Sequence, residues 1–437
     1  MSTSFADLGV SADLIDALDK RQITEPFPIQ IAAIPDALAG RDISGRAPTG
    51  SGKTLAFGIP TIERVPRARR LRPGALILAP TRELAAQIQK DLLPLAKTRG
   101  RRVIAVYGGV GYETQIRELR RGVDVLVACP GRLIDLVERR AVELDGVEIV
   151  VIDEADRMAD MGFLPQVRKL LDLVSENRQT ILFSATLDGD VGALTREYQD
   201  NPVRHEVGDT EPDLEASTHA FWHIEATDRP RHTAQLINEH GSTIVFTRTR
   251  HGADRLVKQL SAAGVSATAI HGGRSQGQRD RALQSFKQGD VDALIATDVA
   301  ARGIHVDGVA CVVHFDIAED AKAYMHRSGR TGRAGASGVV VTLVSDALVR
   351  DVRRLQKDVG LVGDLERVGR APAGSAPATA APRRTESRPE TRSEKRPNPR
   401  ADARPARHAA RRPDGATPPR RSSPSRERRR QRRGTGN

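Results

Sequence analysis

The chain has 437 residues, which is enough for two or three domains, and 39% of them are hydrophobic, enough for ordinary cores. The net charge of +12 is concentrated at one end: residues 370–437 hold 20 Lys and Arg against 6 Asp and Glu, so the preceding residues carry −2. Cys129 and Cys311 form neither a disulfide framework nor a zinc-binding spacing, and no segment resembles a signal peptide or a membrane span, so we expect a soluble, cytoplasmic protein.

The predicted elements, in chain order, are short apolar runs that alternate with amphipathic stretches. A first series of strands is expected at residues 75–79, 103–107, 123–127, 148–152 and 180–183. After a polar and acidic break, a second series is expected at residues 243–246, 267–270, 293–296, 311–315 and 339–343. Strands that alternate with helical spacing favour mostly parallel sheets, so we predict two α/β domains in tandem. The expected boundaries are a first domain at 1–208, a linker at 209–217, a second domain at 218–365 and a tail at 366–437.

The C-terminal tail is expected to be disordered. After Val368 the chain contains no Leu, Ile, Val, Met or aromatic residue, and it holds 11 of the 25 prolines. Such a segment cannot bury enough apolar surface to offset the entropy cost of ordering. Its arginines suit a sequence-independent RNA tether with salt-dependent contacts, and the alternative is a solvated extension without a ligand.

Residues 47–54, Ala-Pro-Thr-Gly-Ser-Gly-Lys-Thr, match a phosphate-binding loop except that Ala47 replaces the first glycine. In such a loop the glycines let backbone N–H groups point at phosphates, the lysine reaches the β- and γ-phosphates, and the hydroxyl reaches Mg²⁺. The alternative is a Gly/Ser-rich surface turn that happens to precede a lysine. The candidate nucleotide-binding residues are Thr49, Gly50, Ser51, Gly52, Lys53 and Thr54.

An acidic tetrad, Asp-Glu-Ala-Asp at residues 153–156, follows the apolar run at 147–152. Ligands bind at the carboxyl ends of strands in an open α/β sheet, where these acids would lie. Asp153 is then a candidate ligand of Mg²⁺, through water, and Glu154 a candidate for orienting or deprotonating an attacking water. Acidic residues also favour helix N-termini for electrostatic reasons alone, which is the alternative interpretation.

A second dense cluster is Tyr-Met-His-Arg-Ser-Gly-Arg-Thr-Gly-Arg at residues 324–333. Glycines between arginines allow close approach to a ligand, and guanidinium groups suit phosphoryl oxygens that gain charge in a transition state. Arg330 and Arg333 are candidates for fingers that complete a site in the other domain when the two domains close. The alternative is a basic surface loop.

The order and spacing of these motifs resemble the DEAD-box ATP-dependent RNA helicases of superfamily 2, bacterial type, over about residues 5–345. The resemblance implies two RecA-like domains with ATP and Mg²⁺ as cofactors and RNA as partner. It implies that Gln30 reads the adenine edge and that Phe5 is an isolated upstream aromatic of the ATP site. Ser184 and Thr186 match the segment that couples hydrolysis to strand separation. Gly303 and His305 match positions of the ATP site in the second domain.

The resemblance also implies an RNA groove that crosses both domains. Its residues would hold sugar and phosphate rather than read bases, and each has capping or turn chemistry as the alternative. The candidates are Pro80, Thr81, Arg82, Gly109, Gly131 and Arg132 in the first domain, and Gly272, Arg279 and Thr297 in the second.

Four positions depart from the family pattern. Ile23 stands where the family often has an aromatic beside the adenine, and Pro48 lacks the N–H of the family's common glutamine. Cys129 replaces a threonine hydroxyl that would contact phosphate. His305 replaces an aspartate that accepts from ribose, so ATP affinity is expected to fall as His305 protonates at about pH 6.

The sequence therefore predicts an enzyme that closes its two domains on ATP and RNA, bends and locally separates RNA strands, and hydrolyses ATP to release them. ATP and RNA should raise each other's affinity because both favour the closed form. Two rival functions stay open. One is a DNA-dependent translocating motor, and the other is an RNA clamp or annealing chaperone with little unwinding.

Overall fold

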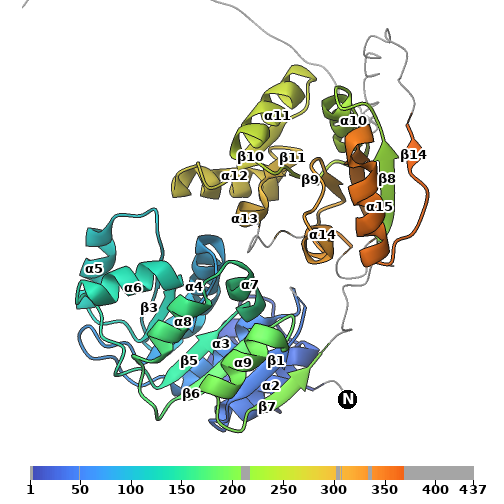
Figure 1. The fold of residues 1–437 in the computed structure, drawn as a ribbon. Helices are drawn as coiled ribbons and strands as arrows, with labels where there is room; N and C mark the ends of the chain where they lie inside the picture. The colour runs from blue at the N-terminus through green and yellow to red at the C-terminus, as the bar shows by residue number, and fades with distance from the viewer. Residues whose placement is uncertain are drawn as a thin grey trace, which may run out of the picture. The chain divides into compact units, whose positions relative to one another are not determined.

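The computed structural model describes residues 3–48, 50–207, 217–301, 306, 308–332 and 337–368. The described residues belong to one compact unit and contain two seven-stranded sheets (Figure 1). Most of the predicted linker and nearly all of the predicted tail lie outside the described residues.

The first sheet is wholly parallel, with strand order β3-β4-β2-β5-β6-β1-β7. Its strands are β1 (Ile43–Arg46), β2 (Ala75–Leu78), β3 (Val103–Val106), β4 (Val125–Ala128), β5 (Ile149–Ile152), β6 (Gln179–Ser184) and β7 (Val203–Glu206). The helices of this domain are α1 (Ala12–Asp19), α2 (Pro28–Leu38), α3 (Lys53–Arg64), α4 (Arg82–Thr98), α5 (Tyr112–Arg120), α6 (Pro130–Glu138), α7 (Ala155–Asp160), α8 (Leu164–Leu171) and α9 (Gly189–Tyr198).

The second sheet is also parallel throughout, with strand order β10-β11-β9-β12-β13-β8-β14. This is the order of the first sheet with each strand number raised by seven, so the chain repeats one topology. The strands are β8 (Ser217–His223), β9 (Thr243–Phe246), β10 (Ala267–Ile270), β11 (Ala293–Ala296), β12 (Cys311–His314), β13 (Gly338–Val344) and β14 (Glu366–Arg367). The helices are α10 (Arg229–His240), α11 (Arg250–Ala262), α12 (Gln276–Gln288), α13 (Asp298–Ala301), α14 (Ala321–Ser328), α15 (Val349–Asp358) and a 3₁₀ helix (Asp346–Leu348).

The expectation of two tandem α/β domains with parallel sheets is confirmed, and every predicted strand is present with bounds within two residues. Four strands were not predicted: β1, β7, β8 and β14. These strands contain polar and charged residues and few aliphatic ones. They are the last two strands in the order of each sheet, where β7 and β14 are edge strands. Strand β8 begins at Ser217, the last position of the predicted linker, and β14 occupies the first two positions of the predicted tail.

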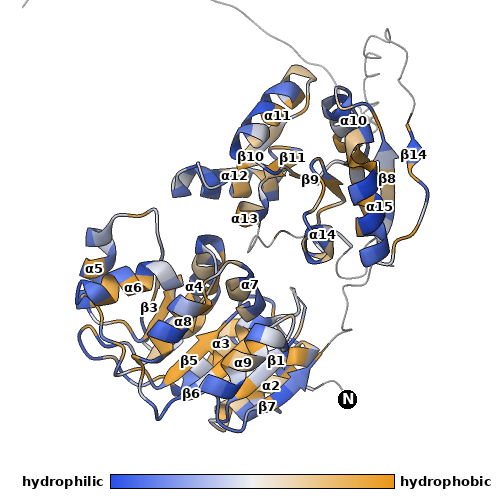
Figure 2. Ribbon diagram, in the orientation of Figure 1, coloured by the Kyte–Doolittle hydropathy of each residue, from blue (hydrophilic) through white to orange (hydrophobic). Residues whose placement is uncertain are grey.

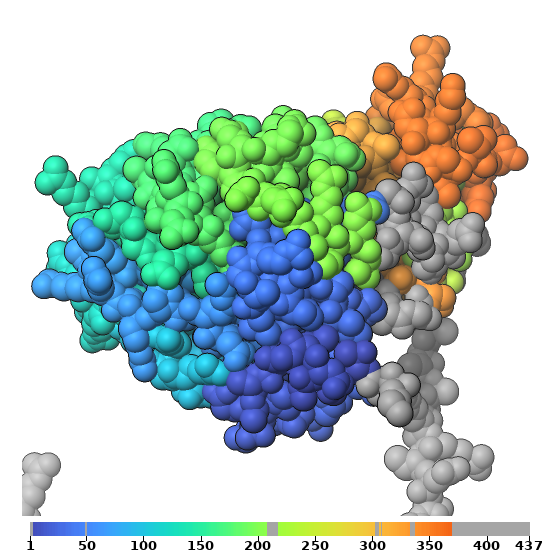
Figure 3. Space-filling model, turned by 90° about the horizontal axis from the view of Figure 1, so that it is seen from below, coloured from blue at the N-terminus to red at the C-terminus, as the bar shows by residue number. Residues whose placement is uncertain are grey.

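Both faces of each sheet are covered by helices, so the central strands are apolar on both sides. In β2, Ala75 and Ile77 belong to the core on the side of α1 to α4, whereas Leu76 and Leu78 belong to the core under α5 to α9. Figure 2 shows these central strands mostly in orange, the hydrophobic end of the scale. Figure 3 shows the N-terminal segment, in dark blue, against lighter blue residues of the same domain, where α1 packs on α4. Within the described parts of the chain, no helix is both long and apolar enough to span a bilayer.

The sheet topology gathers the predicted motifs of the first domain at the carboxyl ends of its parallel strands. In the first domain, the phosphate loop follows β1, the acidic tetrad follows β5, and Ser184 ends β6. Strands β1, β6 and β5 are neighbours in the sheet, so their carboxyl ends lie side by side. Parallel pairing therefore brings together residues that are about 130 positions apart in the sequence.

Candidate functional site

The phosphate-loop motif forms a tight turn between β1 and α3. Gly50 and Gly52 have φ of 93° and 86°, in the left-handed region that strongly favours glycine. A Cβ at Gly52 would also collide with the side chains of Gln30 and Phe27. Lys53 is 9% exposed, and its Nζ donates to the Ala47 carbonyl oxygen at 3.0 Å. The loop is therefore folded around its lysine, and Thr49 lies outside the described residues.

Gln30 connects the start of α2 to this loop. Its Nε2 donates to the Gly52 carbonyl oxygen at 2.9 Å, and its Oε1 accepts from the Phe27 N–H at 2.9 Å. Each half of the amide keeps one further hydrogen-bonding position, a donor on Nε2 and an acceptor on Oε1. Bidentate contact with an adenine edge requires such a pair, but Gln30 is 1% exposed and does not line the pocket described below.

The aromatic residue that lines the nucleotide pocket is not the one that the sequence analysis selected. Phe5 is 2% exposed and belongs to the hydrophobic core under α1, so it does not line the pocket described below. Phe27, which the sequence analysis did not select, is 53% exposed and lines that pocket. The only signal in the sequence was a phenylalanine just before Pro28. Such a residue is a weak signal, because single apolar residues are common on protein surfaces.

Asp153 and Glu154 lie at the end of β5 in contrasting environments. Asp153 is 2% exposed, and burial raises the pKa of its carboxyl to about 7, opposed by the nearby Lys53 ammonium. Its Oδ1 accepts from the Glu154 N–H at 3.0 Å. Glu154 has φ 53° and ψ 52°, a left-handed conformation that costs a non-glycine residue about 1–3 kcal/mol. Such strain persists where the surrounding structure fixes the residue, and it is typical of functional sites.

Ser184 links the acidic tetrad to the Ser-Ala-Thr segment. Its Oγ accepts from the Asp156 N–H at 3.1 Å and from the Thr186 N–H at 3.3 Å. Ser184 is fully buried, whereas Thr186 is exposed. One hydroxyl group therefore joins the two segments.

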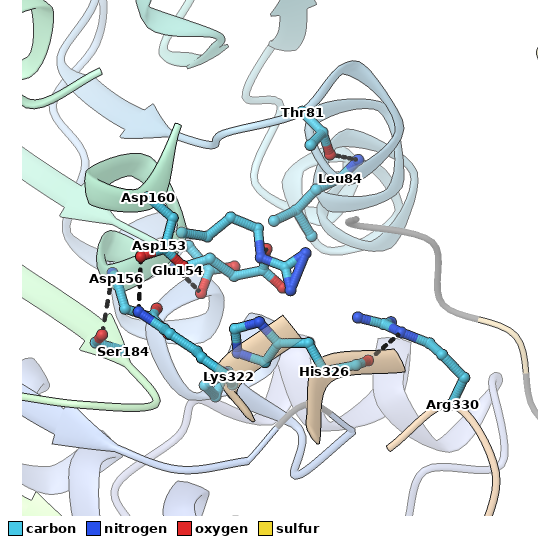
Figure 4. Close-up of polar contacts among 12 residues, drawn as sticks. Thr81, Leu84, Asp153, Glu154, Asp156, Asp160, Ser184, Lys322, His326 and Arg330 are labelled. Atoms are coloured by element: carbon cyan, nitrogen blue, oxygen red, sulfur yellow. Dashed lines mark hydrogen bonds and ion pairs between the residues drawn. The ribbon is translucent and has the colours of Figure 1, made fainter. Parts of the chain in front are cut away.

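One pocket of about 230 Å³ contains most of the predicted catalytic residues. Arg330 of the second domain lines it together with residues of the first, as Figure 4 shows for Asp153, Glu154 and Arg330. Arg330 is 6% exposed, and its Nε donates to the His326 carbonyl oxygen at 3.3 Å. The lining residues are Arg21, Phe27, Gly50, Gly52, Lys53, Thr54, Leu55, Leu84, Gln87, Asp91, Asp153, Glu154 and Arg330.

Helix α14 supplies further side chains to the same region (Figure 4). Lys322 Nζ contacts Asp160 Oδ1 of α7 at 2.7 Å. Burial and the positive charges of Arg157 and Arg330 lower the pKa of His326 to about 4, so its ring is neutral at pH 7. The next residue, Arg327, is not available for phosphate, because it makes a bidentate pair with Asp298 at 2.6 and 2.7 Å.

The predicted RNA contacts of the first domain lie at the ends of β2, β3 and β4. The Arg82 guanidinium lies beside Gly109, where φ is +81° and where a Cβ would collide with it. Thr81 Oγ1 accepts from the Leu84 N–H at 3.3 Å, so this threonine caps α4. Pro80 precedes it at the end of β2, and Gly131 lies in the first turn of α6.

Arg132 is engaged by protein groups rather than open to solvent. Its Nη1 donates to the Val110 carbonyl oxygen at 2.9 Å and to Gln115 Oε1 at 3.0 Å, and its guanidinium lies 4.0 Å from the Tyr112 ring centroid. These contacts fix the loop that follows β3. Cys129, which precedes α6, has its thiol pKa raised to about 12 by burial and by Glu83.

The second domain brings its predicted RNA residues to the ends of β10 and β11. Gly272 is exposed, with open space around its Cα, and Thr297 directly follows β11. Arg279 contacts Glu83 of the first domain, with 3.0 Å between Nη2 and Oε2. Gln276 Nε2 donates to the other oxygen of Glu83 at 3.0 Å. All three side chains of this contact are more than nine-tenths buried.

Three other predicted site residues lie outside the described residues: Gly303, His305 and Arg333. The sequence analysis also missed several groups that the structure brings to the site. Arg21 lines the pocket while bonded to Asp91, with 2.9 Å from Nη1 to the Asp91 carbonyl oxygen. Arg157 directly follows the acidic tetrad and is buried beside it, and that position in the sequence was the signal that could have identified it.

Comparisons with known proteins agree with this arrangement. The sequence model of the DEAD/DEAH box helicases matches residues 27–194, and that of the helicase conserved C-terminal domain matches residues 228–335. The chain is 42% identical over 368 residues to DEAD-box ATP-dependent RNA helicase 9, mitochondrial, of Arabidopsis thaliana, covering 82% of this chain and 60% of that relative. It is 38% identical over 350 residues to DEAD-box ATP-dependent RNA helicase CshA of Bacillus licheniformis, covering 79% and 71% respectively.

A solved structure of S. cerevisiae Dbp5 bound to RNA and ADP BeF3 is similar in fold as well as in sequence. It superposes with a TM-score of 0.72 at 28% identity, covering 84% of this chain and 96% of that chain. The chain spans between 49% and 61% of the length of five plant relatives to which it is 42% identical.

Proposed function

The chain belongs to the DEAD/DEAH box helicase family, and we propose from this that it is an ATP-dependent RNA helicase. It binds RNA across both domains, separates short duplexes locally and hydrolyses ATP to release the strands. The observation that carries the proposal is the pocket in which Lys53, Asp153 and Glu154 meet Arg330 of the second domain. The share of length matched in the Bacillus relative supports a place among bacterial members, and two unpaired cysteines support a cytoplasmic location.

The first domain holds the nucleotide. The loop of Gly50 to Gly52 presents backbone N–H groups to the phosphates, and Lys53 exchanges the Ala47 carbonyl oxygen for phosphate oxygens. Thr54 and Asp153 supply a hydroxyl and a carboxylate, the hard oxygen donors that Mg²⁺ prefers, so the donor set fits this ion. When bound, Mg²⁺ neutralises charge on the phosphates during transfer. The buried Asp153 is suited to this contact, since a cation nearby favours its charged form.

Hydrolysis requires a water to attack the γ-phosphorus while the bond to the β-phosphate oxygen breaks. Glu154 orients this water and takes its proton, and its left-handed backbone sets the carboxylate toward the pocket. Arg330 stabilises the charge that develops on the γ-phosphoryl oxygens, and Arg333 is proposed as its companion. Because Arg330 belongs to the second domain, hydrolysis depends on the approach of the two domains.

RNA binding is coupled to that approach through Glu83. This residue lies next to Arg82 in the segment proposed to hold RNA, and it pairs with Gln276 and Arg279 of the second domain. A residue next to the proposed RNA-binding Arg82 therefore makes the contact between the domains. Ser184 adds the second connection, because its hydroxyl joins the tetrad to Thr186.

The proposal is tested with purified protein and a short RNA duplex. Wild-type protein is expected to hydrolyse ATP faster with RNA than without it and to separate the duplex when ATP is present. Glu154→Gln is expected to keep ATP-dependent RNA binding but to lose multiple turnover. A protein that anneals strands equally well with Glu154→Gln would instead be an annealing chaperone. Equal stimulation by DNA would indicate a DNA-dependent motor, and no ATP turnover would refute the proposal.

A further inference from the structure

Arg157 is a buried cation whose hydrogen-bonding groups are only partly satisfied. It lies in α7, one residue past the acidic tetrad, and it is 4% exposed. Among the described residues, its Nη1 has no hydrogen-bond partner. Its nearest counter-charge is Glu154, with 3.7 Å between Nε and Oε2. That distance allows charge attraction but is too long for a hydrogen bond.

Burying a guanidinium with so little compensation is unfavourable for folding. The penalty for a buried ion is several kcal/mol unless a counter-charge and hydrogen bonds offset it. A methionine or leucine of similar size would fill the same space without that penalty. A charge at this position therefore calls for an explanation beyond the stability of α7.

The carboxylate of Glu154 shows the complementary feature. Its Oε2 is also buried without a hydrogen-bond partner among the residues that the structure describes. At 3.7 Å the ion pair restrains the carboxylate by its charge, without a direct hydrogen bond from Arg157 to Oε2.

We propose that Arg157 is a positioning residue for hydrolysis: its guanidinium attracts the Glu154 carboxylate by its charge and so holds this group in the orientation that faces the attacking water. This rests on the proposed function, in which Glu154 is the group that orients and deprotonates the water. Arg157 touches neither the nucleotide nor the water in this proposal and acts through Glu154 alone.

The second domain closes over the other side of Arg157. A cavity of about 10 Å³, large enough for about one water molecule, is lined by Arg157, His326 and Arg330 among others. Arg157 also contributes to keeping His326 uncharged. The guanidinium is thus enclosed from both domains, which keeps its attraction for Glu154 strong by excluding solvent.

The test is a double-mutant cycle on the full chain. Arg157→Met and Arg157→Lys are made alone and in combination with Glu154→Gln, and single-turnover ATP hydrolysis is measured with saturating RNA. Arg157→Met is expected to slow hydrolysis between about 10-fold and 100-fold, the range expected when a reacting group is misplaced. The ATP concentration for half-saturation should change less than about 2-fold. Arg157→Lys should recover part of the rate, because lysine restores the positive charge but not the planar guanidinium group.

In the Glu154→Gln background, Arg157→Met is expected to have almost no further effect, because the group it positions has gone. An equal slowing in both backgrounds, or no slowing in the wild type, would overturn the inference while leaving the proposed function intact. A wild-type protein without ATP hydrolysis would overturn the proposed function itself. Arg168→Met serves as the matched control, since Arg168 makes a surface pair with Glu197 at 2.8 Å. Melting temperatures show whether Arg157→Met has a folding defect. If it has, the double-mutant cycle is measured with Arg157→Lys instead.

Discussion

Glu83 offers a perturbation that separates closure of the two domains from the folding of either one. Its carboxylate accepts a hydrogen bond from Gln276 and pairs with Arg279, and these partners belong to the second domain. The first domain keeps its own core when Glu83 is replaced by alanine, because both polar contacts of the carboxylate lead to the other domain. Only the form in which the domains touch should lose stability.

The magnitude follows from the burial of the three side chains. Removing one partner of a buried ion pair costs about 3–5 kcal/mol, since the other charge is left uncompensated. Arg279 is solvated when the domains separate, so we take the lower limit, about 3 kcal/mol, which corresponds to about 150-fold in an equilibrium constant. By linkage, the factor by which a non-hydrolysable ATP analogue strengthens RNA binding should fall by up to this amount.

The assay is fluorescence anisotropy of a labelled single-stranded RNA, with and without the analogue. Glu83→Ala should lower the affinity for RNA chiefly in the presence of the analogue. Glu83→Gln should keep part of the strengthening of RNA binding by the analogue, because its amide oxygen can still accept a hydrogen bond from Gln276. Glu138→Ala is the control, because Glu138 makes an exposed pair with Lys169. If Glu83→Ala leaves the ratio of the two affinities unchanged while the protein remains folded, the reasoning is wrong.

Three further predictions follow from buried polar groups and from the tail. Burial holds the pKa of His314 well below its usual range, so at acidic pH the unfolded chain binds a proton at this residue and the folded chain does not. The free energy of unfolding should therefore fall as the pH drops below about 6.5. The melting temperature of His314→Phe should therefore fall less than that of the wild type between pH 7 and pH 5. The same fall in both proteins would contradict this. Ser184→Ala leaves the buried N–H of Asp156 without its acceptor, so it should lower stability by about 1–3 kcal/mol and reduce duplex separation more than ATP turnover. Equal losses in both activities would argue against a coupling role. Deletion of residues 370–437 should weaken RNA affinity and reduce its dependence on salt by about 0.7 in logarithmic slope per lost phosphate contact, and an unchanged slope would refute the tether.

The proximity of the phosphate loop and the acidic tetrad could be predicted from the sequence because each motif is local. Glycines at 50 and 52 with Lys53 at the start of a helix are typical of a phosphate loop, and Asp153 follows a run of β-branched residues that is typical of a buried strand. Parallel pairing then brings the two segments together without further information. The strand predictions succeed for the same reason, since central strands that are buried on both faces have long apolar runs.

The contacts between the two domains could not be predicted in this way. Glu83 and Gln276 are 193 positions apart, and nothing in either local sequence shows that they meet. Phe5 illustrates the opposite difficulty, because an isolated aromatic suits a core as well as a binding site, and the structure places it in the core. Strand β8 was missed because its polar residues lack the pattern of a central strand. These features depend on tertiary packing, which local patterns do not encode.

The most direct test of a site completed by both domains is ATP turnover by Arg330→Met at saturating RNA. This residue lines the pocket with Lys53 and Glu154 but belongs to the other domain. The account predicts that turnover falls by on the order of 10³-fold, as for other arginine fingers, while an ATP analogue still binds to the first domain. Turnover equal to that of the wild type would contradict it.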